Sequence, residues 1–212
     1  MAAEILEQLA EALIKGQAPV VKELTQKAID DGIDASEILN DGLVAGMSVI
    51  GDRFKRNEVY IPEVLIAARA MNSGMELVKP LLLAAGVKAK GTVCCATVKG
   101  DLHDIGKNLV CMMLEGAGYE VIDLGVNCTP EQFVKGVQEN DADAIGMSAL
   151  LTTTMTNMKA TIDAFTEAGL RDKVKIMVGG APLTQSFSDE IGADGYAPDA
   201  ASAVDLMAEL VG

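Results

Sequence analysis

The sequence is poor in the residues that most often mark a catalytic or metal-binding protein. Its 212 residues include one histidine, no tryptophan and only 3% aromatic residues. None of its cysteines forms a Cys-x-x-Cys motif, and with a single histidine beside them they make a poor zinc site. We expect them to be reduced and mostly buried, without a redox function. They are Cys94, Cys95, Cys111 and Cys128.

Positive charge and long apolar runs are also scarce. The chain has 17 Lys and Arg residues against 31 Asp and Glu, a formal net charge of −14. A surface of this sign repels phosphate groups, which argues against a nucleic-acid or membrane partner. No stretch approaches the roughly 18–20 apolar residues of a membrane span, and Glu4 and Glu7 stand where a signal segment would be basic and then apolar. We expect a cytoplasmic protein.

The first part of the chain has helical periodicity and no convincing strand. Apolar residues recur in steps of three and four in four successive segments. Asp34 is expected to cap the third helix, and the fourth is expected to run from Pro62 and to end before Pro80. Helices joined by such short turns predict a four-helix bundle over residues 1–87. The charged stretch Val87–Lys90 is the expected domain boundary and hinge.

Residues 91–212 alternate between strand-like and helix-like patterns. This alternation predicts an α/β domain with a flavodoxin-like (Rossmann-like), doubly wound, five-stranded parallel sheet of order 2-1-3-4-5. The expected strands are Thr92–Thr97, Glu120–Leu124, Ala144–Ser148, Lys175–Val178 and Gly195–Tyr196, and the expected helices are Gly106–Gly116, Pro130–Asn140, Thr154–Ala168, Leu183–Ile191 and Asp199–Leu210.

The single histidine, His103, lies on the loop between the first of these strands and the first helix. Such a loop lies at the carboxyl edge of the sheet, where open α/β folds bind ligands. Asp101 could accept a hydrogen bond from the imidazole nitrogen that faces away from a metal and so fix the tautomer of His103. Gly106 would allow a ligand to approach the backbone closely. A lone histidine is more often a surface or satisfied interior residue, so this loop does not establish a metal site by itself.

Small and hydroxyl-bearing residues follow the other strands of the expected sheet. Ser148–Thr154 comes after the third strand, Gly179-Gly180 after the fourth and Gly125 after the second. Each has an ordinary explanation, because threonines cap helices and a glycine pair makes a turn. Together at one edge they would leave a slot between the strand ends.

In this order, Asp101-x-His103-x-x-Gly106, Ser148-Ala149-Leu150 and Gly179-Gly180 closely resemble the signature of cobalamin-binding domains of the base-off, His-on type. The helical part is similar to the cap that precedes this domain in corrinoid proteins of methylamine, quaternary-amine and methanol methyltransferase systems, and in the cobalamin module of methionine synthase. The motifs that carry the second likeness are Asp41-Gly42-Leu43, Gly46-Met47, Gly51, Phe54, Tyr60-Ile61-Pro62-Glu63-Val64, Ala67-Ala68 and Met71.

The resemblance implies a role for each matching residue. His103 would be the lower axial ligand of cobalt, Asp101 would hold its other nitrogen, and Thr154 would complete a hydrogen-bonded relay. The displaced dimethylbenzimidazole tail would fill the slot. The bundle would cover the upper face of the corrin with Tyr60, Met71 and Met75, although core packing is the alternative for the two methionines. The residues implied to contact the cofactor are Gly100, Asp101, Leu102, His103, Asp104, Gly106, Gly125, Ser148, Leu150, Thr152, Gly179, Gly180 and Ala200.

The function implied by the resemblance is methyl carriage. Cob(I)alamin would accept a methyl group from a methylamine, a quaternary amine such as a betaine, methanol or a methoxy compound, and methylcob(III)alamin would pass it to tetrahydrofolate or coenzyme M. The implied partners are a substrate:corrinoid methyltransferase, a second methyltransferase for the acceptor and a corrinoid reductive activase. The sequence has no Walker A loop, no nucleophile elbow and no Gly-x-Gly-x-x-Gly. We therefore expect a carrier subunit that catalyses neither half-reaction alone.

Three other readings remain open at this point. The chain could be the small subunit of an adenosylcobalamin-dependent mutase, but such subunits lack a helical part like Leu39–Val78. It could be a cobalamin-sensing regulator, but these normally add a DNA-binding module, and no basic patch is present. An α/β binding protein without cobalt would require the whole set of motifs to be accidental.

Overall fold

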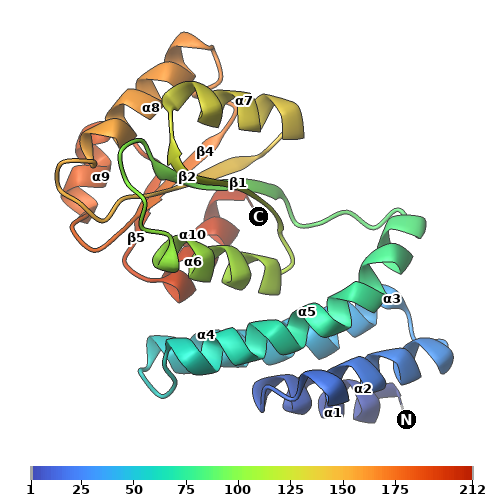
Figure 1. Cartoon of the computed structure of the whole chain (residues 1–212). Helices are drawn as coiled ribbons and strands as arrows, with labels where there is room; N and C mark the ends of the chain where they lie inside the picture. Colours follow the sequence, from blue (N-terminus) through green and yellow to red (C-terminus); the bar gives the residue numbers. More distant parts are fainter. Residues whose placement is uncertain (1, 212) are drawn as a thin grey trace. The chain divides into compact units, whose positions relative to one another are not determined.

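In the computed structural model, which describes residues 2–211, helices alone build the first part of the chain (Figure 1). Three helices are regular, and the remaining rod runs without a break from an α-helical turn through a π-helical stretch into another α-helix. The rods pack pairwise as the four-helix prediction requires. Their bounds are α1 Ala2–Ile14, α2 Ala18–Asp30, α3 Ala35–Glu37, η1 Ile38–Val44, α4 Ala45–Lys55 and α5 Ile61–Ala84.

Glycines let the rods of this bundle approach closely. A Cβ at Gly42 would lie 2.6 Å from Leu9 Cδ2, and one at Gly74 would lie 2.8 Å from Leu43 Cδ2. Such distances are shorter than contacts between carbon atoms allow, so a larger residue would force the helices apart. The bundle therefore depends on small residues at its helix contacts.

The ends of the third and fourth rods test two sequence predictions. Asp34 caps the third rod by accepting a 2.8 Å hydrogen bond from Ser36 N–H, as expected. The prediction that the fourth helix ends before Pro80 was wrong, because α5 continues to Ala84. Proline removes only one helical hydrogen bond, and the apolar stripe that includes Val78 continues to buried Leu82. Burial of that stripe outweighs the lost bond.

The chain then divides, near Ala89 and Lys90, into a second compact unit built on a parallel sheet. The strand order is β2-β1-β3-β4-β5 and every pairing is parallel, which confirms the predicted topology. The interior strand β1 is buried along almost its whole length, as expected for a strand covered on both faces. The bounds are β1 Thr92–Val98, β2 Glu120–Cys128, β3 Ala144–Ser148, β4 Lys175–Gly179 and β5 Gly195–Ala197.

Helices cover both faces of this sheet (Figure 1). α6 (Ile105–Gly116) and α10 (Ala200–Val211) lie on one face, and α7 (Pro130–Asn140), α8 (Thr156–Glu167) and α9 (Gln185–Ile191) lie on the other. The expected starts of α8 and α9 were each two residues early. Residues 151–155 form turns, and Thr184 caps α9 by accepting a hydrogen bond from Phe187 N–H.

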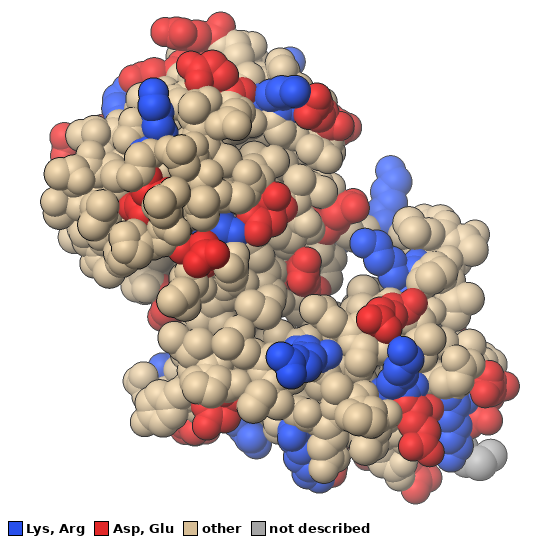
Figure 2. Space-filling view, in the orientation of Figure 1, with Lys and Arg blue, Asp and Glu red and all other residues tan. Residues whose placement is uncertain are grey.

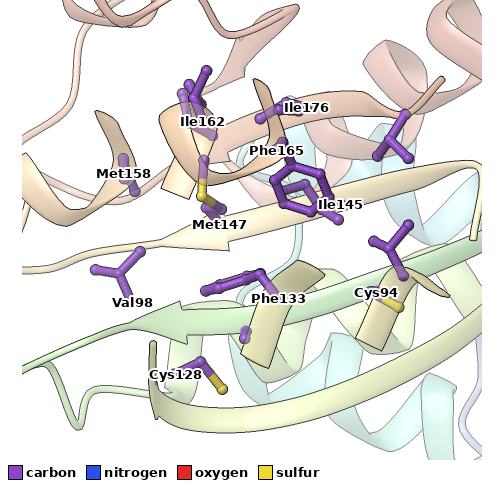
Figure 3. Close-up of a cluster of buried hydrophobic side chains, with 14 of the residues drawn as sticks. Cys94, Val98, Cys128, Phe133, Ile145, Met147, Met158, Ile162, Phe165 and Ile176 are labelled. Atoms are coloured by element: carbon purple, nitrogen blue, oxygen red, sulfur yellow. The ribbon is translucent and has the colours of Figure 1, made fainter. Parts of the chain in front are cut away.

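The core of the second unit lies between the sheet and the helices α7, α8 and α9. Figure 3 shows Phe133 and Phe165 over the strand residues Ile145 and Met147, all of them almost fully buried. Burial of an aromatic or aliphatic side chain of this size contributes about 1.5–3 kcal/mol. This packing fixes the strands, and with them the loops that leave their carboxyl ends. All four cysteines are buried, as predicted.

Charged side chains of both signs are spread over the face of the molecule that Figure 2 shows. Figure 2 shows acidic and basic residues separated by broad uncharged areas on the face in view. Within the described part of the chain, no helix combines the length and apolar character that crossing a membrane requires.

Candidate functional site

The candidate site lies on the loop from Lys99 to Asp104, which leaves the carboxyl end of β1 and leads into α6. β1 lies between β2 and β3 in the sheet, so its loop is flanked by the ends of these two strands. Gly100 adopts φ +82°, a left-handed conformation that turns the chain sharply after the strand. The next residue, Asp101, is thereby directed into the protein and is completely buried.

The Asp101 carboxylate binds five donors. Its Oδ2 accepts hydrogen bonds from Leu150 N–H at 2.8 Å, Leu151 N–H at 3.3 Å and the Thr154 hydroxyl at 2.8 Å. Its Oδ1 accepts from the His103 N–H at 3.1 Å and lies 2.7 Å from His103 Nδ1. A buried charge is tolerated when it is satisfied in this way.

These bonds determine the charge of the group. Burial by itself would raise the pKa of the Asp101 carboxyl, but the hydrogen bonds that it accepts, from Leu150 N–H and then from His103, outweigh burial and hold the pKa well below its usual range. The group is therefore a carboxylate at neutral pH. Because a carboxylate can only accept hydrogen bonds, the 2.7 Å contact places a proton on His103 Nδ1.

The imidazole of His103 is held at one nitrogen and its side chain is about half exposed. Its side chain is 53% exposed, while its carbonyl oxygen accepts a 2.8 Å bond from the buried Thr97 hydroxyl. With the Nδ1 proton directed to Asp101, Nε2 carries the lone pair of the neutral imidazole. A histidine oriented by a carboxylate in this way is the usual arrangement of a metal ligand.

Large apolar side chains at the His103 loop and on the loop that holds Asp101 are exposed. Leu102 and Ile105, on either side of His103 in the chain, are 71% and 72% exposed, and Leu150 and Leu151 on the β3–α8 loop are each 42% exposed. Exposed apolar groups gathered at one place mark a binding surface more often than an ordinary surface. The surface offers an apolar ligand both contact area and one nitrogen ligand.

The glycines of the predicted site fall into two classes. A Cβ at Gly180, where φ is +135°, would lie 1.9 Å from Ala149 O, so this glycine lets the β3 and β4 loops meet. A Cβ at Gly106 or Gly125 would meet no protein atom within 4 Å. Both positions are open. A larger residue at Gly106 would take up room without a clash in the protein, whereas at Gly125, where φ is +90°, it would also strain the backbone.

The structure brings part of the predicted site together. Asp101, His103, Thr154 and Leu150 form one hydrogen-bonded group, and Ser148 pairs with Gly179 at the neighbouring strand ends.

The remaining predicted residues lie outside this group. Thr152 is exposed on the turn before α8, Asp104 accepts a bond from the Asn108 side chain, and Ala200 is buried at the start of α10. In the bundle, Tyr60 is exposed and Met71 is buried, and Met75 is partly buried. Their placement over a cofactor stays a prediction.

Three residues that hold the loop, and Lys107 in the helix after it, were missed by the sequence analysis. Thr97 and Asn127 bind backbone groups of residues 100–103, and the Asn157 side chain donates to Lys99 O at 2.9 Å. Buried Lys107 donates 2.6 Å bonds to Asp123 and to its neighbour Asn108. A hydroxyl at the end of a buried strand was the one available signal, for Thr97. The others act across distances in the sequence that no local pattern reveals.

The donor set fits one kind of metal group better than others. Among the residues described, no cluster of three or more His, Cys, Asp or Glu could hold a bare metal ion. A metal that arrives in a macrocycle brings most of its ligands and needs only an axial nitrogen from the protein. His103 Nε2 supplies such a nitrogen, and the exposed leucine and isoleucine side chains beside it suit the apolar face of a macrocycle.

Comparison with known proteins identifies the family. The model of the B12 binding domain matches residues 91–205, and a second B12 binding domain model matches residues 5–79. The chain is 44% identical over 209 residues to the dimethylamine corrinoid protein of Methanosarcina barkeri, covering 98% of both chains. It is 43% identical over 215 residues to a corrinoid protein of Desulfitobacterium hafniense (strain Y51), covering 100% of both.

Solved structures agree with this comparison. The methanol:cobalamin methyltransferase complex of Methanosarcina barkeri matches with a TM-score of 0.88 and 33% identity, over 98% of this chain and 80% of that one. A cobalamin-binding protein of Desulfitobacterium hafniense DCB-2 matches with a TM-score of 0.80 and 31% identity, over 98% of both chains. The chain therefore belongs to the corrinoid proteins of methyltransferase systems and carries B12 binding domains.

Proposed function

We propose that this chain is a methyl carrier that binds a corrinoid in the base-off, His-on state, with His103 as the lower axial ligand. The observation that carries the proposal is the exposed imidazole whose Nδ1 is fixed by a buried, fully satisfied carboxylate, Asp101. When bound, the corrinoid supplies a nucleophilic cobalt centre that takes up and releases a methyl group. The protein positions and shields that centre.

The Asp101 network would do three things for the ligand. It keeps the proton on Nδ1, so that the Nε2 lone pair is available to cobalt. It orients the ring, since the carboxylate is itself held by Leu150 N–H and the Thr154 hydroxyl. If the network is formed before the cofactor binds, it would also reduce the ordering cost of binding.

The strand ends would take the displaced nucleotide tail. Ser148 and Gly179 lie side by side where β3 and β4 end, and the close approach of Gly180 to Ala149 holds the two following loops together. Gly125, which the structure places within β2 at its bulge and not after the strand as the sequence predicted, leaves room beside Ala96. A planar base could enter such a region of small residues at the carboxyl edge, which is where parallel sheets receive ligands.

The roles of the two units, the linker and the partner proteins follow from the resemblance to corrinoid proteins. Residues 91–212 would bind the corrinoid, and residues 1–87 would cap its upper face with Tyr60, Met71 and Met75. The linker between them would let the cap move aside for each partner. The partners would be a methyltransferase for the donor, a second one for tetrahydrofolate or coenzyme M, and a reductive activase.

A methylated amine is the donor that we favour. Relatives at 40–44% identity are named dimethylamine and trimethylamine corrinoid proteins. The test is to load the protein with hydroxocobalamin, reduce it, and add dimethylamine, trimethylamine or methanol, each with its own methyltransferase. Formation of the methylated cofactor, followed by its absorption spectrum, with an amine but not with methanol would support the proposal. Methylation by none of these donors would contradict it, and cleavage of added adenosylcobalamin with a mutase partner would favour the mutase reading.

A further inference from the structure

A residue outside the predicted site, Asn127, holds the histidine loop from the side of β2. Its Oδ1 accepts a 2.7 Å hydrogen bond from Gly100 N–H, and its own N–H donates a 3.0 Å bond to Asp101 O. One residue thus binds the backbone on both sides of the Gly100–Asp101 peptide group. The side chain of Asp101 is held by a different element, the β3–α8 loop.

The backbone around Asn127 is built for this contact. Asn127 adopts φ +55°, one of only a few residues other than glycine with positive φ in the described chain. Asparagine tolerates the left-handed region better than most residues but is still rare there, so the surroundings must maintain it. Such conformations concentrate at functional sites.

The pairing of β2 with β1 shows how Asn127 reaches the loop. One step along β1, from Cys95 to Ala96, corresponds to two steps along β2, and the two steps from Ala96 to Val98 correspond to three. β2 therefore bulges beside the end of β1. A bulge re-aims the residues that it contains and is common next to binding sites. Here it places Asn127, which is 26 residues beyond Asp101 in the sequence, against the Asp101 carbonyl oxygen.

Without Asn127, the loop would keep its bonds to β1 and α8 but would lose its bonds to β2. Asn157 binds Lys99 O and Thr97 binds His103 O, but Gly100 N–H and Asp101 O have Asn127 as their hydrogen-bond partner. Gly100 is at φ +82°, where the chain has most freedom, so it is the point at which the loop would otherwise move. Movement there changes the distance between His103 Nδ1 and the carboxylate.

We infer that Asn127 is a positioning residue for the axial histidine: it fixes the Gly100–Asp101 backbone so that the Asp101 carboxylate meets His103 Nδ1 before any corrinoid binds. The inference rests on the proposed function for its purpose, but its structural content can be tested on the protein without cofactor. The hydrogen bonds of Asn127 go to the backbone of Gly100 and Asp101, so it would act on the imidazole through the loop.

The test compares three variants with wild type. Asn127→Gly retains the left-handed backbone but loses the bond to Gly100 N–H, whereas Asn127→Asp retains an acceptor at the same place. Asn57→Gly is the matched control, because Asn57 has the same φ of +55° in the helical unit. If Asn127→Gly fails to fold, Asn127→Ser, whose side chain is too short to reach Gly100 N–H, takes its place.

Two measurements are made on each variant. The first is the NMR signal of the His103 Nδ1 proton in the protein without cofactor, which is unambiguous because the chain has one histidine. The second is the affinity for hydroxocobalamin. We expect Asn127→Gly to lose the proton signal to solvent exchange and to bind about five- to tenfold more weakly, as loss of one well-formed hydrogen bond implies. Asn127→Asp and Asn57→Gly should resemble wild type.

The outcomes separate this inference from the proposed function. A normal proton signal and normal affinity in Asn127→Gly would overturn the inference. Equal losses in Asn127→Gly and Asn57→Gly would also overturn it, because they would show a general loss of stability. Failure of wild type to bind hydroxocobalamin would contradict the proposed function, and the proton signal would still decide whether Asn127 orients the histidine.

Discussion

Replacing Asp101 by Asn should destabilise the second unit and move the proton of the only histidine. The substitution retains the size of the side chain but turns one acceptor oxygen into a donor NH₂ group. The best arrangement keeps the amide oxygen at the Oδ2 position, where Leu150 N–H and the Thr154 hydroxyl donate at 2.8 Å. The NH₂ group then faces the His103 N–H, which cannot become an acceptor.

The magnitude follows from these contacts. The charge-assisted bond from the His103 N–H is lost, at about 1.5–3 kcal/mol, and the donors at Oδ2 now meet a neutral acceptor, which weakens each of them. We expect the free energy of unfolding to fall by about 3 kcal/mol. The new NH₂ group can donate to His103 Nδ1, which would transfer the imidazole proton to Nε2 and remove the lone pair that we assign to cobalt.

Two assays check this prediction in the protein without cofactor. Urea unfolding measures the stability, and ¹⁵N chemical shifts of the imidazole report which nitrogen carries the proton. Thr154→Val is the control, because it removes one donor to Asp101 and leaves the carboxylate intact; it should cost about 1 kcal/mol and leave the proton on Nδ1. An Asp101→Asn variant with wild-type stability and the proton still on Nδ1 would refute the reasoning.

Three further predictions concern the second unit. Gly106→Ala should keep or slightly raise the stability of the cofactor-free protein, because its Cβ meets no protein atom and alanine favours a helix, yet it should weaken hydroxocobalamin binding; unchanged affinity in a titration would contradict this. Gly180→Ala should lower the free energy of unfolding by more than about 2 kcal/mol, since its Cβ would lie 1.9 Å from Ala149 O at a φ of +135°, and a wild-type urea midpoint would exclude the clash. Burial raises the pKa of the Cys94 thiol to about 11. Because the unfolded chain releases this proton at lower pH, the stabilisation is complete below about pH 9 and is lost as pH rises toward 11, by about 2–3 kcal/mol in total. Cys94→Ala should show a shallower loss over that range, and an equal loss would remove Cys94 as the cause.

Most of the fold could be predicted because its signals are local. Alternation of buried strands with amphipathic helices allows few topologies for a parallel sheet, and the observed strand order is the predicted one. The error at Pro80 arose from a local rule that tertiary burial overrides, since the helix continues to cover its apolar stripe as far as Leu82. The helix propensity of a single residue such as proline decides where a helix ends only where tertiary packing does not favour another end.

The candidate site was predictable in part for the same reason. Asp101 and His103 are two residues apart, so a local pattern suffices to pair them, and their 2.7 Å contact is the predicted one. Thr154 was placed by resemblance, and its hydroxyl does reach Asp101. Asn127 could not be found, because its role depends on a bulge in β2 and on a backbone turn at Gly100. Neither feature leaves a mark in residue periodicity.

The most direct test of the account is the electron paramagnetic resonance spectrum of the protein loaded with cob(II)alamin, in its natural form and with ¹⁵N-labelled histidine. The chain has one histidine, so the label marks His103 alone. If this residue is the axial ligand, the nitrogen splitting is a triplet in the natural protein and becomes a doublet in the labelled one. A triplet in both samples would show that the benzimidazole of the cofactor remains on cobalt, and would contradict the central claim.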